Sequence, residues 1–213
     1  MTTRYPGYDV QAKRDGPSWD DITRAVVDQR TGLGGGPRFL SPDEFRTLAA
    51  LCARILPQPP ERPLVPLAAI VDAKLAGNQG DGYRDSCMPP LREAWKRGLA
   101  ALDAEAQTRH QKAFAALPVD QRDALLRDAH AGELSHPAWK GMPPKLFFTR
   151  RVLHDIVGAY YSHPQAWSEI GFGGPANPRG YVRLAAGHRD AWEAAEAGAD
   201  DAQKARELNR RVR

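Results

Sequence analysis

Histidine is the residue type in this chain best suited to hold a metal ion or to move a proton, and there are six histidines. The nearest pairs are His130 with His136 and His154 with His163. Neither pair has the i, i+4 spacing that places two imidazoles on one helical face, and no cysteine or carboxylate pattern joins them. We therefore expect no metal site in this chain.

Nucleophilic catalysis and dinucleotide binding also lack their usual patterns. Ser162 lies next to His163, but adjacency in sequence does not make a catalytic pair, and no G-x-S-x-G motif is present. The run Gly171-Phe172-Gly173-Gly174-Pro175 does not have G-x-G-x-x-G spacing, and no strand is predicted before it. We expect no catalytic residue and no cofactor bound by this chain. A small helical enzyme that uses His154, Asp155 and His163 as acid and base groups is kept as an alternative.

The two cysteines, Cys52 and Cys87, are far apart in sequence and form no C-x-x-C pair. Their spacing supports neither a structural zinc site nor a thioredoxin motif. Two readings stay open: free thiols that pack as small hydrophobic residues, or one disulfide in an exported protein.

The charge pattern limits the classes of partner. Thirty basic and 26 acidic residues are mixed along the chain, for a net charge of +4. The chain has no block of basic residues that could follow a phosphate backbone, so we expect no nucleic-acid binding. No run of apolar residues is long enough for direct membrane insertion, and residues 1–36 lack the apolar core of a signal peptide. We expect a soluble cytoplasmic protein, periplasmic only if it is exported with a signal-bearing partner.

Apolar residues recur at helical spacing, and no segment alternates apolar and polar residues over the length of a strand. The sequence therefore predicts an all-α fold of irregular helices with long Pro- and Gly-rich loops. We expect the helix that starts at Pro143-Pro144 to be the longest and to form the spine of the domain. The expected helices are residues 18–30, 42–56, 67–76, 91–102, 106–117, 119–131 and 143–161.

Local signals mark several helix ends. Ser41, Pro42 and Glu44 form the pattern of a capping box with proline at the first helical position. Ser18 is expected to cap the helix at 18–30, and Gly132 stands where a C-cap is expected.

The chain divides into three expected parts: an N-terminal arm at 1–36, a helical domain at 37–184, and a charged helical tail at 185–213. The tail has a thin apolar stripe, which predicts a solvated, partly frayed helix. A helix docked on a partner is the alternative. The stripe consists of Trp192, Ala195, Ala199 and Ala202.

Two groups of large apolar side chains are candidates for contact with another protein. One is a face of the arm helix, and the other is a segment after the spine helix where aromatic residues alternate with glycines and prolines. Interface hot spots are enriched in Trp and Tyr, so we predict a partner surface there. The alternative is that both groups pack on the chain's own core. The predicted partner-binding residues are Trp19, Ile22, Val26, Tyr160, Tyr161, Trp167, Phe172, Gly173, Gly174 and Pro175.

Several motifs together resemble the gluconate 2-dehydrogenase subunit 3 family, over about residues 37–184. The resemblance is carried by two runs near the start, Phe39-Leu40-Ser41-Pro42-Asp43-Glu44-Phe45 and Leu51-Cys52-Ala53-Arg54-Ile55-Leu56-Pro57. It is carried further by Phe147-Phe148, Gly158-Ala159-Tyr160-Tyr161-Ser162-His163-Pro164, Trp167 and Ile170-Gly171-Phe172-Gly173-Gly174-Pro175. The chain departs from the family at Gln165-Ala166, where a longer Y-G-G-N step is usual, and no twin-arginine signal precedes the domain.

The resemblance implies a non-catalytic small subunit of a sugar or sugar-acid dehydrogenase. Its large subunit would be an FAD enzyme of the glucose-methanol-choline type, so FAD is expected in the partner and not in this chain. The small subunit would bind the flavoprotein as a heterodimer or higher hetero-oligomer and help it mature. A general helical interaction or chaperone module without a dedicated enzyme is the remaining alternative.

Overall fold

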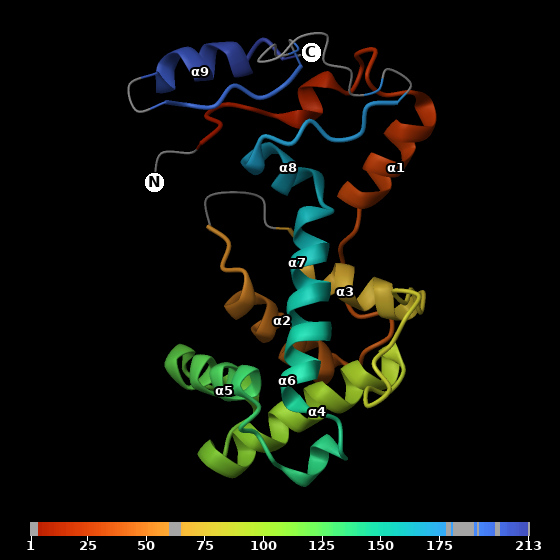
Figure 1. Cartoon of the computed structure of the whole chain (residues 1–213), viewed down its shortest axis with the longest axis vertical. Helices are drawn as coiled ribbons and strands as arrows, with labels where there is room; N and C mark the ends of the chain where they lie inside the picture. The colour runs from red at the N-terminus through yellow and green to blue at the C-terminus, as the bar shows by residue number, and fades with distance from the viewer. Residues whose placement is uncertain are drawn as a thin grey trace. The chain divides into compact units, whose positions relative to one another are not determined.

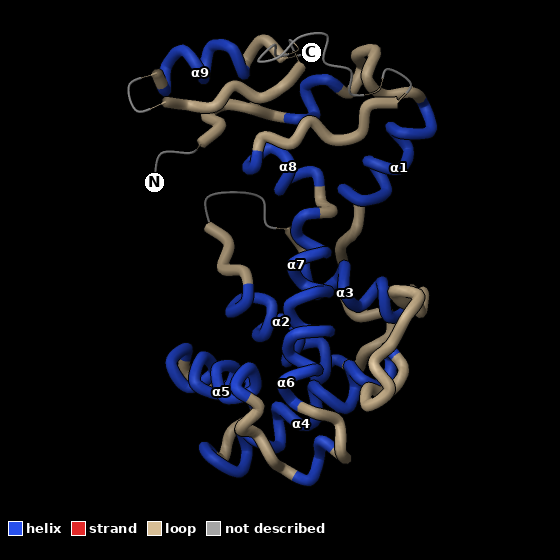
Figure 2. The backbone as a smooth tube through the Cα atoms, in the orientation of Figure 1, coloured by secondary structure: helices blue, strands red, loops and turns tan. Residues whose placement is uncertain are grey.

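The computed structural model describes residues 4–59, 65–177, 180, 190, 192–198 and 201–212. Within these residues the secondary structure is helical and contains no strand, which confirms the all-α fold (Figure 2). The chain forms two compact units. The central unit is Gly34–Tyr160, and the terminal unit joins Met1–Leu33 to Tyr161–Arg213. The arm, the segment after the spine helix and the tail therefore belong to one unit.

The central unit contains most of the predicted helices, and its core is formed where α2, α4 and the spine meet α5. The α3 helix has the predicted bounds, and α5 ends as predicted at Gly132, which has a φ of 86°. The helices are α2 (Pro42–Ile55), α3 (Leu67–Ala76), α4 (Leu91–His110), α5 (Val119–Ala131), α6 (Pro144–Phe147) and α7 (His154–Tyr161).

The start of α2 is fixed by its predicted capping box. Ser41 Oγ accepts the Glu44 N–H at 3.2 Å, while Glu44 Oε2 accepts the Ser41 N–H at 2.8 Å. The buried Asp72 carboxylate of α3 accepts the Leu40 N–H at 2.8 Å and the Arg38 N–H at 2.5 Å. A side chain of α3 thus satisfies the backbone donors that lead into α2.

The α4 helix differs from the sequence prediction, because it continues without a break to His110. The separate helix expected at 106–117 is therefore wrong. No glycine or proline interrupts residues 103–110, and Ala106 is buried on the same helix. The break comes at Gln111, which has a left-handed φ of 55°, and only a short 3₁₀ turn follows at Phe114–Ala116.

The spine is continuous from α6 to α7, as predicted, but its middle is a π-helix at Phe148–Leu153. Figure 1 shows it as one teal rod. The α4 helix, with 20 residues, is longer, so the spine is not the longest helix. Phe147 packs on the backbone of α4, since a Cβ atom at Gly98 would lie 2.1 Å from its ring.

The terminal unit is assembled from segments far apart in sequence. Its helices are η1 (Val10–Lys13), α1 (Asp21–Thr31), α8 (Pro164–Ile170) and α9 (Ala202–Asn209). The N-cap of α1 is Asp20 and not Ser18, because Asp20 Oδ1 accepts the Thr23 N–H at 2.8 Å. The segment expected as a loop contains α8, which begins at a proline in its first turn and ends at Gly171.

The tail is not a solvated helix, so that prediction is wrong for its described part. Only Ala202–Asn209 is helical, while Trp192 and Ala195 are buried outside the helix; Ala199 lies outside the described residues. The indole of Trp192 is buried in the core of the terminal unit, and burial of its apolar surface is stabilising. The core of the unit is Tyr8, Val10, Trp19, Val27, Trp167, Trp192 and Val212.

Candidate functional site

The run Gly171–Pro175, named here the glycine-rich motif, is packed between the arm and the tail. Gly171 has a φ of +68°, and a Cβ atom there would lie 2.6 Å from the Tyr5 ring. A Cβ atom on Gly173 would lie 2.4 Å from the Trp192 ring. These glycines let aromatic rings rest directly on the backbone. The motif therefore has a packing role within the terminal unit.

The carbonyl of Pro175 joins this motif to the arm. It accepts the Trp19 indole N–H at 2.7 Å and a bond from Lys13 Nζ at 3.4 Å. Next to it the Asp20 N–H donates to the Asn177 carbonyl at 2.9 Å. The arm is thus hydrogen-bonded along the end of the motif.

Trp167 lies on α8 and belongs to the core of the terminal unit, with an exposed fraction of 3%. Its indole N–H donates to the Tyr161 carbonyl at 2.8 Å, and its ring meets Phe172 edge-on at 5.7 Å. Gly174 also packs on this ring, since a Cβ atom there would lie 3.1 Å from the indole. Trp167 is therefore not presented at the surface of its unit as an anchor.

The predicted partner-binding residues separate into buried and exposed sets. Trp19, Tyr160, Trp167, Gly173 and Gly174 are buried, and Pro175 is half-buried. Tyr160 belongs to the central unit, so the structure does not bring all ten residues into one unit. Contact with a partner remains a prediction for the exposed set: Ile22, Val26, Tyr161 and Phe172.

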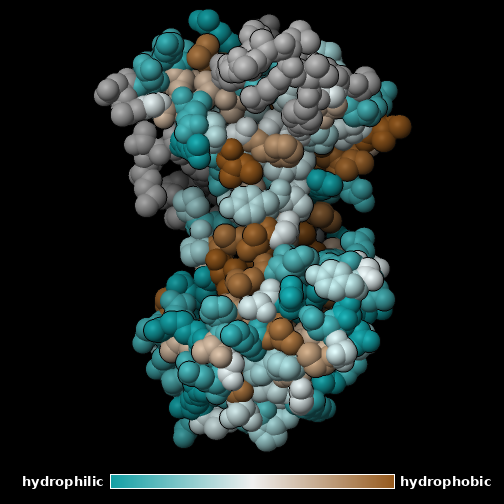
Figure 3. All heavy atoms as spheres, viewed as in Figure 1, coloured by the Kyte–Doolittle hydropathy of each residue, from teal (hydrophilic) through white to brown (hydrophobic). Residues whose placement is uncertain are grey.

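The exposed set includes two residues one turn apart on α1, named here the α1 face. Ile22 is 76% exposed and Val26 is 42% exposed. Figure 3 shows apolar side chains at the surface over this helix. On the segment around α8, Phe172 is 45% exposed, and Ile170, which the sequence reasoning missed, is 44% exposed. The terminal unit thus offers apolar side chains to solvent although its core is filled.

The central unit contains a buried ionic network that the sequence did not predict. Asp155, on α7, has a fully buried carboxylate. Its Oδ1 contacts Lys74 Nζ at 2.8 Å, its Oδ2 accepts the Trp95 indole N–H at 2.7 Å, and Arg151 lies 3.7 Å away. Buried carboxylates require such partners, because desolvation without them is costly.

Asp81 extends this network from the loop after α3. It contacts Lys74 at 3.0 Å and Arg151 at 2.6 Å. Burial raises the pKa of Asp81, but hydrogen bonds from Arg151 and Lys74 outweigh it and leave the pKa below its ordinary value. Burial lowers the pKa of Lys74, and its hydrogen bonds to Asp155 and Asp81 outweigh that effect and raise it. Both shifts favour the charged forms of Asp81 and Lys74 at neutral pH.

Asp81, His154 and Asp155 have ligand atoms within 4.8 Å of one another, a spacing that a metal ion would accept. However, Lys74 Nζ lies between the two carboxylates, in contact with both. Arg151 supplies a second positive charge to the same pair. A divalent cation would have to displace both side chains, so the donor set fits an ion-pair network better than a metal centre.

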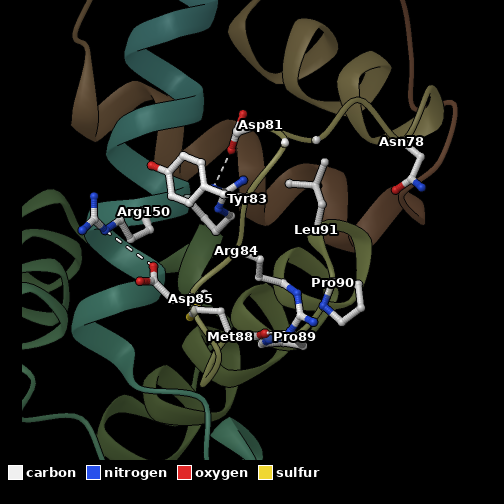
Figure 4. A pocket seen from close by; sticks show the side chains of 13 residues that line it. Asn78, Asp81, Tyr83, Arg84, Asp85, Met88, Pro89, Pro90, Leu91 and Arg150 are labelled. Atoms are coloured by element: carbon white, nitrogen blue, oxygen red, sulfur yellow. Dashed lines mark hydrogen bonds and ion pairs between the residues drawn. The ribbon is translucent and has the colours of Figure 1, made fainter.

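A cavity of about 330 Å³ lies beside this network (Figure 4). Arg150 and Asp85 approach to 3.6 Å across it, and Arg84 donates to the Met88 carbonyl. Arg151 and Asp81 form part of its wall. The charged side chains that line it contact each other or backbone oxygens, so they have structural partners within the described residues.

A second cavity, of about 440 Å³, is lined by apolar and neutral residues of α2, of the start of α3 and of the segments next to these helices, among them Phe45, Leu56 and Leu67. Cys52 lies in its wall with a buried side chain, and burial raises the pKa of its thiol to about 12. Both cysteines are free, and Cys87 is exposed. Cys52 is therefore a packing residue with little thiolate.

The groups of the alternative enzyme hypothesis have structural roles here. Asp155 is held in ion pairs, and His154 is an exposed neighbour whose Nδ1 lies 3.2 Å from it. His163 belongs to the terminal unit, where its Nδ1 accepts the Gln165 N–H at 3.2 Å and caps α8. Burial lowers the pKa of His163, which favours the neutral, accepting imidazole.

The described residues form an all-α protein. Its central unit contains a buried ionic network, and its terminal unit exposes several apolar side chains. A family model described as gluconate 2-dehydrogenase subunit 3 matches residues 42–174, more than half of the chain, so the chain belongs to this family. No curated protein and no solved structure gives a match. In the part of the chain that the structure describes, no helix combines the length and apolarity needed to cross a membrane.

Proposed function

We propose that this chain is a non-catalytic small subunit that binds an FAD-dependent dehydrogenase of sugars or sugar acids and stabilises it or helps it mature. The observation that carries the proposal is the family match over residues 42–174, whose description names a dehydrogenase subunit. The FAD would be bound by a large subunit of the glucose-methanol-choline type, as the resemblance to the family implies.

The geometry supports a binding role over catalysis by this chain. A catalytic acid or base needs access to a substrate proton. Asp155 has a fully buried carboxylate within its ion pairs, and the Nδ1 atom of His163 is used as a helix cap. Asp155 therefore has a structural role within the central unit, and His163 has one within the terminal unit.

The exposed apolar residues of the terminal unit supply a surface for the partner. Ile22 and Val26 face solvent on α1, and Tyr161 and Phe172 do so at either end of the α8 segment. Large apolar and aromatic side chains contribute much of the binding energy at protein interfaces. We assign the contact with the dehydrogenase to this set.

Co-expression tests the proposal. The chain, carrying an affinity tag, would be produced together with a glucose-methanol-choline type flavoprotein from the same organism. We expect the flavoprotein to co-purify at a fixed ratio, and its soluble yield and flavin content to fall without the small subunit. Absence of any flavoprotein in the purified complex, or sugar oxidation by the small subunit alone, would refute the proposal.

Surface variants test the assigned contact. Ile22→Asp and Phe172→Asp place a charge in the exposed apolar set and should each weaken binding at least about tenfold, as expected for a desolvated unpaired charge. Val119→Asp is the matched control, because Val119 is a similarly exposed apolar residue of the central unit. Equal binding by all three variants would place the contact elsewhere.

A further inference from the structure

The tail runs beside the arm and is bonded to it at several points. The Ala197 N–H donates to the Arg4 carbonyl at 2.8 Å, and the Tyr8 hydroxyl donates to the Trp192 carbonyl at 3.3 Å. The red arm and the blue tail can be followed side by side in Figure 1. The two ends of the chain are thus held together within the terminal unit.

Asn209 is the residue that fastens the end of α9. It is buried, and its amide nitrogen donates to the Pro6 carbonyl and to the Ala195 carbonyl, each at 3.0 Å. Its amide oxygen accepts the Ala195 N–H at 2.6 Å. One side chain therefore bonds the last helix both to the tail before it and to the arm, in surroundings where an unmade bond would be costly.

Trp192 is placed between the glycine-rich motif and the arm. Its ring packs on Gly173, and the Lys13 ammonium lies 4.5 Å from the ring centroid. Lys13 is fully buried, and its ammonium is also 5.6 Å from the Trp19 ring and 3.4 Å from the Pro175 carbonyl. A cation held on aromatic faces and away from water binds more strongly than at an exposed site.

Lys13 therefore connects three segments: the arm that carries it, the motif through Pro175, and the tail through Trp192. The arm and the tail both lie outside residues 42–174, the part that matches the family, whereas nearly all of the glycine-rich motif lies inside it. The arm and the tail thus both pack on the glycine-rich motif at the end of the family region.

From this arrangement we infer that the C-terminal tail is a latch: Trp192 and Asn209 hold the arm on the glycine-rich motif, and only the latched arm presents the α1 face. Releasing the tail removes one wall of the site that buries Lys13. Trp192 then no longer covers the Lys13 ammonium, and a cation–π contact that opens to water is weaker than a buried one. The arm then loses its bonds to the tail at Arg4, Pro6 and Tyr8, so the stretch of arm that leads into α1 is held less firmly. The presentation of the α1 face to a dehydrogenase rests on the proposed function, whereas the latch itself does not.

Hydrogen exchange on the purified full-length chain tests the latch. Gly173→Ala adds a Cβ atom 2.4 Å from the Trp192 ring and so pushes the tail from the motif. Amide protection over residues 21–31 should fall at least about tenfold, as when a local opening becomes easier. Gly198→Ala is the matched control in the same tail, since its nearest neighbour, Asp201 Cβ, is 4.0 Å away, and should leave protection unchanged.

A second variant guards against general misfolding. Asn209→Ala removes the bonds to Pro6 and Ala195 without adding volume, and should lower protection over the same residues. Residues 91–110, in α4 of the central unit, serve as the internal standard and should keep wild-type exchange. The latch is refuted if residues 21–31 stay fully protected in both variants, or if α4 loses protection to the same extent.

Binding to the flavoprotein tests the second part of the inference, that only the latched arm presents the α1 face. If the wild-type chain binds and the unlatched Gly173→Ala chain binds at least about tenfold more weakly, the latch controls presentation of the α1 face. Equal binding by an unlatched chain would contradict the link between the latch and the α1 face, but not the latch itself. If the wild-type chain does not bind, the proposed function fails, and the exchange experiment still decides the latch.

Discussion

The indole N–H of Trp95 donates to Oδ2 of Asp155 across 2.7 Å, and both side chains are buried. This bond joins the second turn of α4 to the start of α7. It also gives the carboxylate a neutral partner in addition to Lys74, so both of its oxygens are occupied. Fully satisfied buried polar networks of this kind specify one packing arrangement among helices.

Asp155→Ala should be one of the most destabilising single changes in the central unit. It leaves Lys74 with one carboxylate and the Trp95 indole with none, and removal of one partner from a buried pair costs about 3–5 kcal/mol. Urea unfolding followed by circular dichroism measures it. Asp43→Ala, which removes an exposed carboxylate paired with Arg46, should change the free energy of unfolding by less than about 1 kcal/mol. Equal effects of the two changes would contradict the structural role of the network.

Gly98→Ala tests the packing of Phe147 on α4. The added Cβ atom would lie 2.1 Å from the phenyl ring, which is buried and cannot move freely. Overpacking of this kind costs about 1–3 kcal/mol, more than the gain in helix propensity of about 1 kcal/mol. Gly158→Ala, on an exposed position of α7 with nothing within 4 Å, should instead stabilise the chain. Thermal melting of both variants gives the sign, and a stabilised Gly98→Ala chain would contradict the packing.

The sequence predicted those elements whose signals are local. Ser41, Pro42 and Glu44 placed the start of α2, and Gly132 placed the end of α5. The start of α8 was missed, because its cap is His163, which is a weak capping signal. The long α4 was divided because the apolar spacing changes after Leu102 while the helix continues through small and polar residues.

The candidate site was less predictable, since its contacts join distant residues. Nothing near Asp155 in sequence shows that Lys74, Asp81 and Trp95 surround it. In the same way, the glycines of the motif indicated a turn, but not that Tyr5 and Trp192 would pack on them from the two ends of the chain. Long-range packing of this kind is decided by the whole fold and not by local propensity.

His163 predicts a pH dependence in the terminal unit. Burial holds the folded pKa of its imidazole below the ordinary value of 6.5. As the pH falls below that value, the unfolded chain takes up the proton first, so stability is lost until the folded pKa is passed. His163→Asn keeps an N-cap acceptor and should remove this part of the loss. Melting temperatures between about pH 5 and pH 7, the range where a histidine titrates, measure it. An unchanged slope in the variant would assign the pH dependence to other groups.

The two cysteines should differ sharply in reactivity. Burial raises the pKa of Cys52 to about 12, so its thiolate is scarce at neutral pH, whereas Cys87 is exposed. A thiol reagent should therefore label Cys87 in the folded chain and Cys52 only after unfolding. Peptide mapping by mass spectrometry checks the order. Cys87→Ser should abolish fast labelling, and persistence of fast labelling in that variant would show that Cys52 is accessible.

Trp167 and Phe172 touch edge-on, yet they should respond differently to truncation. Trp167 is 3% exposed in the core of the terminal unit, so Trp167→Ala should leave a cavity and cost about 3–5 kcal/mol. Phe172 is 45% exposed, so Phe172→Ala should cost less stability and act mainly on binding. Chemical unfolding of each variant, combined with co-purification of the flavoprotein, separates the two effects. If Trp167→Ala abolished binding while its unfolding matched wild type, Trp167 would be a partner contact after all. If Phe172→Ala lost stability to the same extent as Trp167→Ala, its exposed ring would belong to the core, and the partner surface would reduce to the α1 face with Tyr161.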